Sequence, residues 1–335
     1  MVVGAPYDSG IDSITGAGIT NVGKAYIFST SGSHLHTLSN RDPAQNDYYG
    51  RQSRCSDTHV VVGNWLDDDI GAATGSADFY LVDGTFVTKV VPTDLVQNDG
   101  FGYAIGMDNS KVAISAKDTS DGGRVYLFNN LGIQANSFKG SDTVTGDTFG
   151  YSIDLADGIL VVGAPNKSSF TGAVYIFDDN GTQLHKFVAP DATAGYYFGY
   201  DVAVSNGKIV VGSYKDSENG LEAGAAHIFL VDGTYVTKLV SPTPNAGDRF
   251  GSSVSISDAQ DLILVGAPKD GHYGSDSGAA YYFQTDGTYV SRLSGKVAGQ
   301  LFGRSVAVSD AAVAAIGAIG DSTFNSGFAG TVYLM

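Results

Sequence analysis

The sequence is poor in several residue types, and each shortage excludes a class of protein. Cys55 is the single cysteine, which excludes an intrachain disulfide and a zinc site built from cysteines. Only Glu218 and Glu222 are glutamates, so nearly all of the 35 acidic residues are aspartates. Since glutamate favours helices and aspartate favours turns, we expect many turns and few helices. No apolar run approaches the ~18 residues that suggest a membrane-spanning helix.

Basic residues are also scarce. The chain has 19 lysines and arginines against 35 acidic residues, which gives a formal net charge of −16. Nucleic acids and anionic membranes are bound by lysine- and arginine-rich surfaces, so we expect no nucleic-acid partner and no membrane insertion. Cations, sugars and proteins remain as classes of ligand. Met1 opens directly onto a strand-like run, so a secretory leader is not visible, and one that has been removed stays an alternative.

Glycine is abundant, with 45 residues against 8 prolines, and it marks an internal repeat. The pair Phe-Gly recurs at intervals of 48 to 52 residues, and Tyr49-Gly50 is a variant of it. Each copy leads through alternating small and apolar residues to a turn, and then to a β-branched run. The Phe-Gly copies begin at Phe101, Phe149, Phe198, Phe250 and Phe302.

Each β-branched run ends in Gly-Ala-Pro or a related triplet. The seven triplets begin at Gly4, Gly63, Ser115, Gly163, Gly212, Gly266 and Gly317. A third run, rich in aromatic and β-branched residues, follows each triplet. A turn then leads to a fourth run, and four of these turns hold the strongest short-range hairpin signal, Asp-Gly or Asn-Gly, at Asp83, Asn180, Asp232 and Asp286. One unit therefore predicts four short antiparallel strands, which we call A to D.

Seven such units predict an all-β fold, a seven-bladed β-propeller of four-stranded antiparallel blades in a single domain. A parallel solenoid would not need a tight hairpin in every unit, and a sandwich would not repeat its sequence seven times. Blades packed face to face would bury the surfaces that one blade alone leaves open. The blade units are expected at about residues 1–48, 49–100, 101–148, 149–197, 198–249, 250–301 and 302–335.

The first and last blades are expected to be incomplete within this chain. Residues 1–6 align with residues 160–165, so the chain opens in strand B of the first blade, and it ends in strand C of the seventh. A missing strand leaves backbone groups unpaired. We therefore expect a further segment or another chain to complete these two blades.

These motifs resemble the FG-GAP repeat, and the clearest copy runs from Phe149 to Phe177. The resemblance covers nearly the whole chain. It implies the seven-bladed propeller found at the head of integrin α chains and in many microbial surface proteins. It also implies an extracellular, cell-surface or virion-surface location, and a part in ligand recognition for the edge that carries the B–C and D–A loops.

The sequence departs from the family in one respect. Several FG-GAP blades carry an acidic calcium loop in the A–B turn, whereas the A–B turns here are short, as at Ala156-Asp157-Gly158. They do not supply the six to eight oxygen ligands that calcium usually takes. We therefore predict no metal and no cofactor. Asp67-Asp68-Asp69 is the one dense carboxylate run, and a solvated acidic loop is favoured over a metal site there.

The longest loops are expected to carry the binding residues. B–C and D–A connections are longer than the A–B and C–D hairpins, and the B–C connection of blade 1, residues 7–22, is the longest. Tyrosine and tryptophan there offer rigid contacts with a polar tip. Packing of the loops onto the blades is the alternative role for each. The candidates are Tyr7, Tyr48, Trp65, Asp67, Tyr196, Tyr197, Tyr214, His272, Tyr273 and Phe324, of which Trp65 is the best single one.

Catalysis finds little support, and no catalytic residue is predicted. His185 and His227 lie in strand-like runs and are interpreted as structural. His34 and His36 share one strand face, but a third metal ligand is not identifiable. No Gly-x-Ser-x-Gly, His-Glu-x-x-His or phosphate-binding glycine loop occurs.

We therefore predict an adhesion or recognition module that binds a glycan or a protein and is not an enzyme. One alternative is a structural subunit of a larger surface assembly. A polysaccharide-acting hydrolase or lyase is a weaker alternative, because the many aspartates offer carboxylate pairs that the sequence does not locate.

Overall fold

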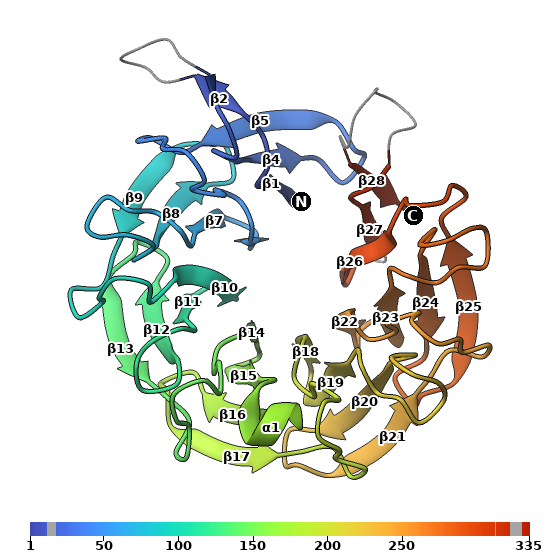
Figure 1. Cartoon of the computed structure of the whole chain (residues 1–335). Coiled ribbons are helices and arrows are strands. Elements are labelled where there is room, and N and C mark those ends of the chain that lie inside the picture. Colours follow the sequence, from blue (N-terminus) through green and yellow to red (C-terminus); the bar gives the residue numbers. More distant parts are fainter. Residues whose placement is uncertain (12–17, 312, 322–329) are drawn as a thin grey trace. The chain divides into compact units, whose positions relative to one another are not determined.

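The computed structural model describes residues 1–11, 18–311, 313–321 and 330–335. In this part of the chain, seven consecutive antiparallel sheets of three or four strands follow one another. The order of strands within each sheet is their order along the chain (Figure 1). Such sheets are the blades of a β-propeller, and the predicted all-β, seven-bladed fold class is confirmed.

Each sheet is one blade, and its strands take the letters predicted above. The first three blades consist of β1 (Val2–Ala5), β4 (Lys24–Phe28) and β5 (His34–Ser39), then β6 (Ser53–Cys55), β7 (His59–Asn64), β8 (Ser76–Leu81) and β9 (Phe86–Val90), then β10 (Phe101–Met107), β11 (Lys111–Ala116), β12 (Arg124–Asn129) and β13 (Gln134–Phe138). Within the described residues the first blade has strands B, C and D, as predicted.

The other four blades follow the same pattern. They consist of β14 (Ser152–Ala156), β15 (Ile159–Ala164), β16 (Ala173–Asp178) and β17 (Gln183–Phe187), then β18 (Val202–Ser205), β19 (Lys208–Ser213), β20 (Ala225–Leu230) and β21 (Tyr235–Leu239), then β22 (Ser253–Ser257), β23 (Leu262–Ala267), β24 (Ala279–Phe283) and β25 (Tyr289–Ser294), then β26 (Phe302–Val308), β27 (Ala314–Ala318) and β28 (Thr331–Leu334). The seventh blade has strands A, B and C among the described residues, again as predicted.

Three small elements lie in B–C connections. Strands β2 (Gly10–Ile11) and β3 (Gly18–Ile19) pair with each other in blade 1. The short element α1 (Lys167–Phe170) lies in blade 4, and Ser168 and Ser169 inside it have left-handed backbone angles. As the glutamate-poor composition predicts, this single turn is the only helix among the described residues. None of the described helices is long and apolar enough to cross a membrane.

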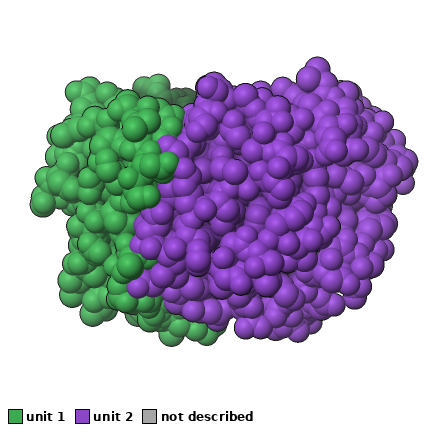
Figure 2. All heavy atoms as spheres, turned by 90° about the horizontal axis from the view of Figure 1, so that it is seen from below, with its two compact units in different colours: residues 1–155, 179–182 green, residues 156–178, 183–335 purple. Residues whose placement is uncertain are grey.

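The chain divides into two compact units. Unit 1 comprises residues 1–155 and 179–182, and unit 2 comprises residues 156–178 and 183–335 (Figure 2). Blades 1 to 3 belong to unit 1, and blades 5 to 7 belong to unit 2. The sites described below each lie within one unit.

Burial explains why strand B reads as a continuous apolar run. In β15 five of the six residues are buried, whereas in the outer strand β17 none is. Blade 4 and blade 5 share one apolar cluster, in which Val161 and Ile176 pack with Ile209. In blade 4, strands B and C are thus almost entirely buried, and strand D is left largely exposed.

The aromatic residue of the Phe-Gly motif anchors each blade to the one before it. Phe101, Phe198 and Phe250 are fully buried. Phe101 packs in one cluster with Phe79 of the preceding blade. Full burial of such a side chain stabilises the fold by roughly 2–3 kcal/mol.

The glycine of Phe-Gly contacts the glycine of Gly-Ala-Pro in the preceding blade. A Cβ built on Gly212 would lie 2.1 Å from the carbonyl oxygen of Gly251, and one on Gly266 would lie 2.1 Å from that of Gly303. No side chain fits at such a distance. The two motif glycines therefore form a backbone contact between consecutive blades. This contact explains why glycine recurs in both the Phe-Gly and the Gly-Ala-Pro motifs.

The predicted Asp-Gly hairpins connect strands C and D. The Asp83 carboxylate accepts a hydrogen bond from the Thr85 backbone N–H at 2.9 Å, and Asp232 and Asp286 make the equivalent bond. Gly84, Gly233 and Gly287 have positive φ angles, as these turns require.

The B–C and D–A connections lie together at one end of the blades. Gly75, which ends a B–C connection, forms a β-bridge with Phe101, which ends a D–A connection. The same bridge joins Gly172 to Phe198 and Gly278 to Phe302. We call this end of the blades the loop edge, and it is the end at which the sequence analysis places ligand binding.

Candidate ligand-binding surface at the loop edge

Most blades carry an aspartate four residues after the first glycine of Gly-Ala-Pro, and it ties strands B, C and D together. In blade 6 Asp270 is 2% exposed, accepts a hydrogen bond from the Tyr281 hydroxyl at 2.5 Å, and lies 3.6 Å from Arg292. Tyr333 donates to Asp321 at 2.6 Å in blade 7. The bond joins strand C to the start of the B–C loop, so these aspartates hold the loop edge in place.

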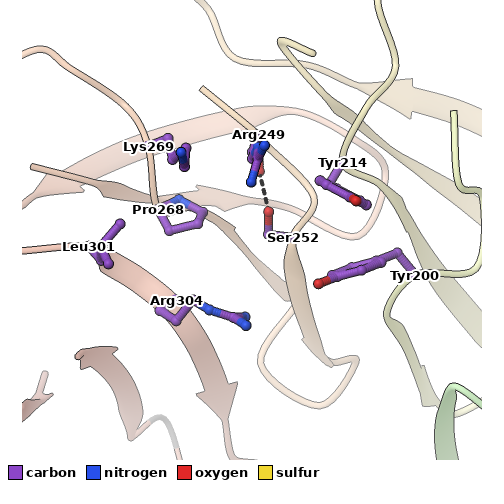
Figure 3. Close-up of a pocket in the computed structure, with 8 residues that line it drawn as sticks. All are labelled: Tyr200, Tyr214, Arg249, Ser252, Pro268, Lys269, Leu301 and Arg304. Atoms are coloured by element: carbon purple, nitrogen blue, oxygen red, sulfur yellow. Dashed lines mark hydrogen bonds between the residues drawn. The ribbon is translucent and has the colours of Figure 1, made fainter. Parts of the chain in front are cut away.

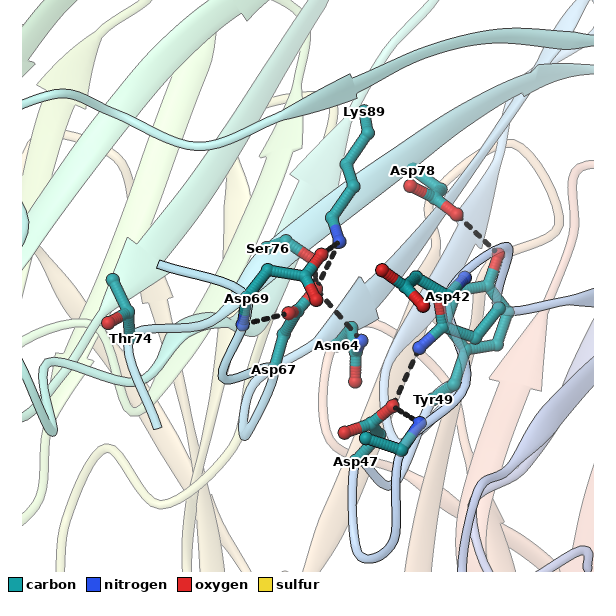
Figure 4. Close-up of polar contacts among 12 residues, drawn as sticks. Asp42, Asp47, Tyr49, Asn64, Asp67, Asp69, Thr74, Ser76, Asp78 and Lys89 are labelled. Carbon is teal, nitrogen blue, oxygen red and sulfur yellow. Dashed lines mark hydrogen bonds and ion pairs between the residues drawn. The ribbon is translucent and has the colours of Figure 1, made fainter. Parts of the chain in front are cut away.

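Asp67 is the corresponding residue of blade 2, and the structure corrects its interpretation. It is 4% exposed and not part of a solvated loop. It accepts hydrogen bonds from Ser76 and from Asn64, and the Lys89 ammonium lies 2.6 Å from it (Figure 4). Lys89 also pairs with Asp69, but Asp68 and Asp69 are both exposed, as predicted for a solvated acidic loop.

Burial changes the titration of the groups around Asp67. It raises the pKa of Asp78 to about 6, although Tyr80 and Tyr49 both donate hydrogen bonds to that carboxylate at 3.2 Å. For Lys89, burial lowers the pKa, but hydrogen bonds to Asp67 and Asp69 outweigh it and hold the pKa above its usual value. Lys89 therefore supplies the cation that this carboxylate cluster needs.

Blade 5 and the D–A connection before it hold the one group of metal-ligand type found among the described residues. Ligand atoms of Asp191, Asp216 and His227 all lie within 4.8 Å of one another. The Lys238 ammonium lies 2.7 Å from Asp216 and 2.5 Å from Asp191, so a protein cation neutralises this cluster. Burial lowers the pKa of His227 to about 4, which keeps the imidazole neutral. Its position in the buried strand β20 agrees with the structural role predicted for it.

The structure brings six of the predicted binding residues together in three pairs. The rings of Tyr7 and Tyr48 lie 5.5 Å apart, those of His272 and Tyr273 lie 4.7 Å apart, and those of Tyr197 and Tyr214 lie 5.5 Å apart. Trp65 instead contacts residues that were not predicted, and Tyr196 is half-buried. Phe324 lies outside the described residues. Cys55 lies in β6, and its side chain is exposed.

Trp65 belongs to a cluster of aromatic and cationic side chains in unit 1. Its ring lies 5.5 Å from that of Tyr103, edge to face. The guanidinium of Arg51 lies 4.5 Å from the Tyr103 ring centre and donates to the Tyr103 hydroxyl at 2.7 Å. Lys117 lies 4.5 Å from the same ring. We call these residues, with Tyr151 against Tyr103 at 5.3 Å, the Trp65 cluster.

Tyr214 lines a pocket in unit 2 whose volume is about 160 Å³. Tyr200 and Tyr214 stand on one side, with ring centres 4.2 Å apart, and Lys269, Leu301 and Arg304 stand on the other (Figure 3). Pro268 lies on the side of Lys269, and Ser252 and Arg249 lie between the two sides. We call this the Tyr214 pocket, and its eight lining residues come from blades 5, 6 and 7 and the D–A connections that precede blades 6 and 7.

Sequence reasoning missed most residues of these two sites, although a positional signal was present. Arg51, Tyr103, Tyr200 and Arg304 each directly follow the glycine of a Phe-Gly or Tyr-Gly copy. Trp65, Lys117 and Tyr214 each occupy the proline position of a Gly-Ala-Pro copy. Because the glycines of the two motifs meet, the residues that follow them converge at the loop edge. Aligning the copies by position would have identified them.

Two lining residues of the pocket lie on strained backbone. Arg249 and Leu301, each directly before a Phe-Gly phenylalanine, have φ angles of 59° and 54°. A left-handed conformation costs a residue other than glycine about 1–2 kcal/mol. Tyr48, Thr148 and Tyr197 share this conformation at the matching position of other blades. The strain accompanies the turn that sends the following aromatic ring into the core.

The chemistry of these sites is suited to binding. Burial raises the pKa of Tyr214 to about 12, so its hydroxyl remains protonated near neutral pH and serves as a hydrogen-bond donor. The buried carboxylates Asp67, Asp216 and Asp270 are each engaged by a lysine or an arginine. Rings, hydroxyls and cations at the loop edge offer stacking and hydrogen bonding to a ligand.

A model of the FG-GAP repeat matches four segments of the chain, at residues 85–128, 134–177, 182–229 and 234–283. Together they make up more than half of the sequence. Each segment starts with strand D of one blade and continues through strand C of the next. A comparison with curated proteins finds no match to the chain.

Proposed function

Because the chain belongs to the FG-GAP repeat family, we propose that it is a recognition module that binds a glycan or a protein through the loop edge in an extracellular setting. FG-GAP propellers are consistent with a binding role, are typically non-enzymatic, and typically occur in extracellular proteins. The net charge of −16 disfavours nucleic acid as the ligand.

One observation carries the proposal: aromatic and cationic side chains gather at the loop edge in both units, in the Trp65 cluster and in the Tyr214 pocket. Tyrosine, tryptophan and arginine are the residues that most often dominate binding energy at interfaces. These positions also interrupt the repeat, since proline fills the Tyr214 position in blades 1, 4 and 6. Side chains that differ from blade to blade are suited to selecting a ligand.

A glycan array probed with the labelled protein, alongside a panel of extracellular proteins, tests the proposal. Tyr214→Ala is expected to weaken any binding that is found by about tenfold or more, as loss of a central aromatic contact would. Tyr289→Ala is the matched control, because Tyr289 is 43% exposed and lies in the outer strand β25. Equal loss in both variants, or no ligand in either panel, would overturn the proposal.

The same panel distinguishes binding from catalysis. A hydrolase or lyase would shorten the polysaccharides that it binds, and reducing ends or unsaturated products would accumulate with time. For a recognition module, the bound glycan is recovered at its original length. Product formation that an Asp67→Asn or Asp216→Asn variant abolishes would favour the enzymatic alternative.

A structural role in a larger assembly is the second candidate, and the two three-stranded blades favour it. Within the described residues, β1 and β28 each pair with a single neighbouring strand, so each has an open backbone edge. Such edges accept a strand from another segment or another chain. Light scattering across a concentration series tests this candidate, which requires a defined oligomer and which a monomer at all concentrations would contradict.

A further inference from the structure

The Tyr214 pocket combines two cations that have no partner in the described part of the chain. The Lys269 ammonium and the Arg304 guanidinium make no hydrogen bond or ion pair to any described residue, and none of the eight residues that line the pocket is acidic. This is unusual in a chain with 35 acidic and 19 basic residues. Most other lysines and arginines here have partners, such as Lys89, Lys208 and Lys238.

Arg249 differs from these two cations because it is held in place. Its Nε and Nη2 atoms donate to one oxygen of Glu222 at 3.3 and 3.0 Å, and Lys215 lies 3.2 Å from the other oxygen. Glu222 thus balances one of the neighbouring positive charges. Lys269 and Arg304 stay unbalanced, so the pocket favours an anion.

The opposite wall of the pocket is aromatic. Tyr200 and Tyr214 pack with an angle of 44° between their ring planes, and both side chains are half-buried. Rings of this kind stack against the apolar face of a sugar, while their hydroxyls bond to its oxygens. At about 160 Å³ the pocket is smaller than the roughly 300–1,000 Å³ of sites for drug-sized ligands. It therefore fits one sugar ring, with the rest of a chain left outside.

Resting on the recognition role proposed above, we propose that the Tyr214 pocket binds an acidic sugar residue. The carboxylate or sulfate group of the sugar lies between Lys269 and Arg304, and its ring packs on Tyr200 and Tyr214. Arginine offers a planar fork that pairs with either oxyanion, and lysine adds a second point charge. An acidic peptide has the charge but lacks the ring, and it is treated as a competing outcome of the test.

Calorimetric titration with matched sugars tests the proposal. The probes are trigalacturonic acid and its methyl ester for the carboxylate, and a sulfated galactose trisaccharide and its unsulfated form for the sulfate. At least one acidic member is expected to bind at least tenfold more tightly than its neutral partner. Since a charge-assisted hydrogen bond contributes about 1.5–3 kcal/mol, Lys269→Gln and Arg304→Gln should each weaken that binding by about ten- to hundredfold.

Two further variants separate a local effect from a general one. Lys296→Gln removes the same charge from an exposed lysine of the same unit that does not line the pocket, and it should leave the affinity unchanged. Tyr200→Ala should weaken the acidic sugar at least tenfold by removing half of the aromatic wall. Circular dichroism of each variant establishes that the fold is retained.

The outcomes are distinct. Equal affinity for acidic and neutral sugars, equal binding of a triglutamate peptide, or equal loss in Lys296→Gln would overturn the acidic-sugar proposal. If array ligands bind while all four probes fail, this inference is wrong and the recognition role stands. If no panel ligand binds either, the recognition role fails as well.

Discussion

At the residue scale, the repeat depends on glycines that serve two separate purposes. Some glycines allow a left-handed backbone, as at Gly207, whose φ is 80° and around which a Cβ would meet no atom within 4 Å. Others allow close approach, as at Gly212, where a Cβ would lie 2.1 Å from the Gly251 carbonyl oxygen. Gly251 combines the two, with a φ of 83° and the Ala225 carbonyl oxygen at 2.1 Å.

Alanine at these three positions should destabilise the fold by different amounts. Gly207→Ala should cost about 1–2 kcal/mol from the left-handed conformation alone. Gly212→Ala should cost about 1–3 kcal/mol from crowding alone. Gly251→Ala should cost about 3 kcal/mol or more, because the two effects combine. Urea unfolding followed by tyrosine and tryptophan fluorescence measures all three.

The order of the three losses is the informative result. Gly207 serves as the control, because it lies in an A–B turn where a Cβ would meet no atom within 4 Å. If Gly212→Ala were as stable as the natural protein, the close glycine contact between blades 5 and 6 would not be needed for stability.

At the scale of the element, strand C carries a polar residue whose identity changes from blade to blade. Its ordinary form is tyrosine, as in Tyr281 bonded to Asp270. At this strand position blade 2 has Asp78 and blade 5 has His227. Burial shifts both groups toward their neutral forms, so it raises the pKa of Asp78 to about 6 and lowers that of His227 to about 4.

His227 should make the fold sensitive to acid. Its pKa is about 4 in the folded chain against an ordinary 6.5, so below pH 6.5 the unfolded chain takes up a proton that the folded chain refuses. Stability is therefore lost as pH falls from 6.5 toward 4, by about 3 kcal/mol in all. His227→Tyr should remove this loss, and urea unfolding at several pH values across the window measures it.

Two comparisons complete the acid experiment. His185→Gln changes an exposed histidine and should leave the pH dependence as it is. Asp78 has the opposite effect on the pH dependence of stability. Its pKa is raised to about 6 in the folded chain, so the fold loses stability as pH rises from 3.8 through about 6. If His227→Tyr lost stability between pH 6.5 and 4 as steeply as the natural protein, the neutral histidine in β20 would not be responsible.

Much of the fold was predictable from sequence, because the same motifs recur at regular spacing along the chain. The spacing of Phe101, Phe149 and Phe198 defines the blades, and dipeptides such as Asp83-Gly84 define the C–D turns. Each of these signals is local, so a single copy can be recognised without knowledge of its neighbours. The matched copies then confirm one another.

The candidate site was less predictable, because its residues meet through contacts distant in sequence. Asp67 reads as part of an acidic loop, since its counter-ion Lys89 follows only after strand C. The Tyr214 pocket joins residues from three blades, and no local motif connects Tyr200 to Arg304. Only two positions of the repeat, the one directly after the Phe-Gly glycine and the proline position of Gly-Ala-Pro, would have indicated which residues converge.

At the scale of the whole molecule, the net charge of −16 acts on both stability and binding. Like charges repel in the compact state more than in the unfolded chain, and dissolved salt screens that repulsion. The Debye length falls from about 30 Å at 0.01 M salt to about 8 Å at 0.15 M.

Sodium chloride should therefore raise the midpoint of thermal unfolding over this range, by about 2 °C for each kcal/mol of repulsion removed. Differential scanning calorimetry measures the shift, with an uncharged solute at equal osmolality as the control. A midpoint that falls with salt would mean that attractive pairs such as Lys238 with Asp216 dominate over the net repulsion.

The matched repeat segments begin at an outer strand and end three strands into the next blade. The sequence repeat is thus offset by one strand from the blade, which is the unit that folds. A segment duplicated or deleted at the C–D turns would rejoin its neighbours with every sheet whole, adding or removing one blade at a time. The number of blades can therefore change without any blade losing a strand. Each copied segment still pairs with the segment before it, because its first strand completes the preceding blade.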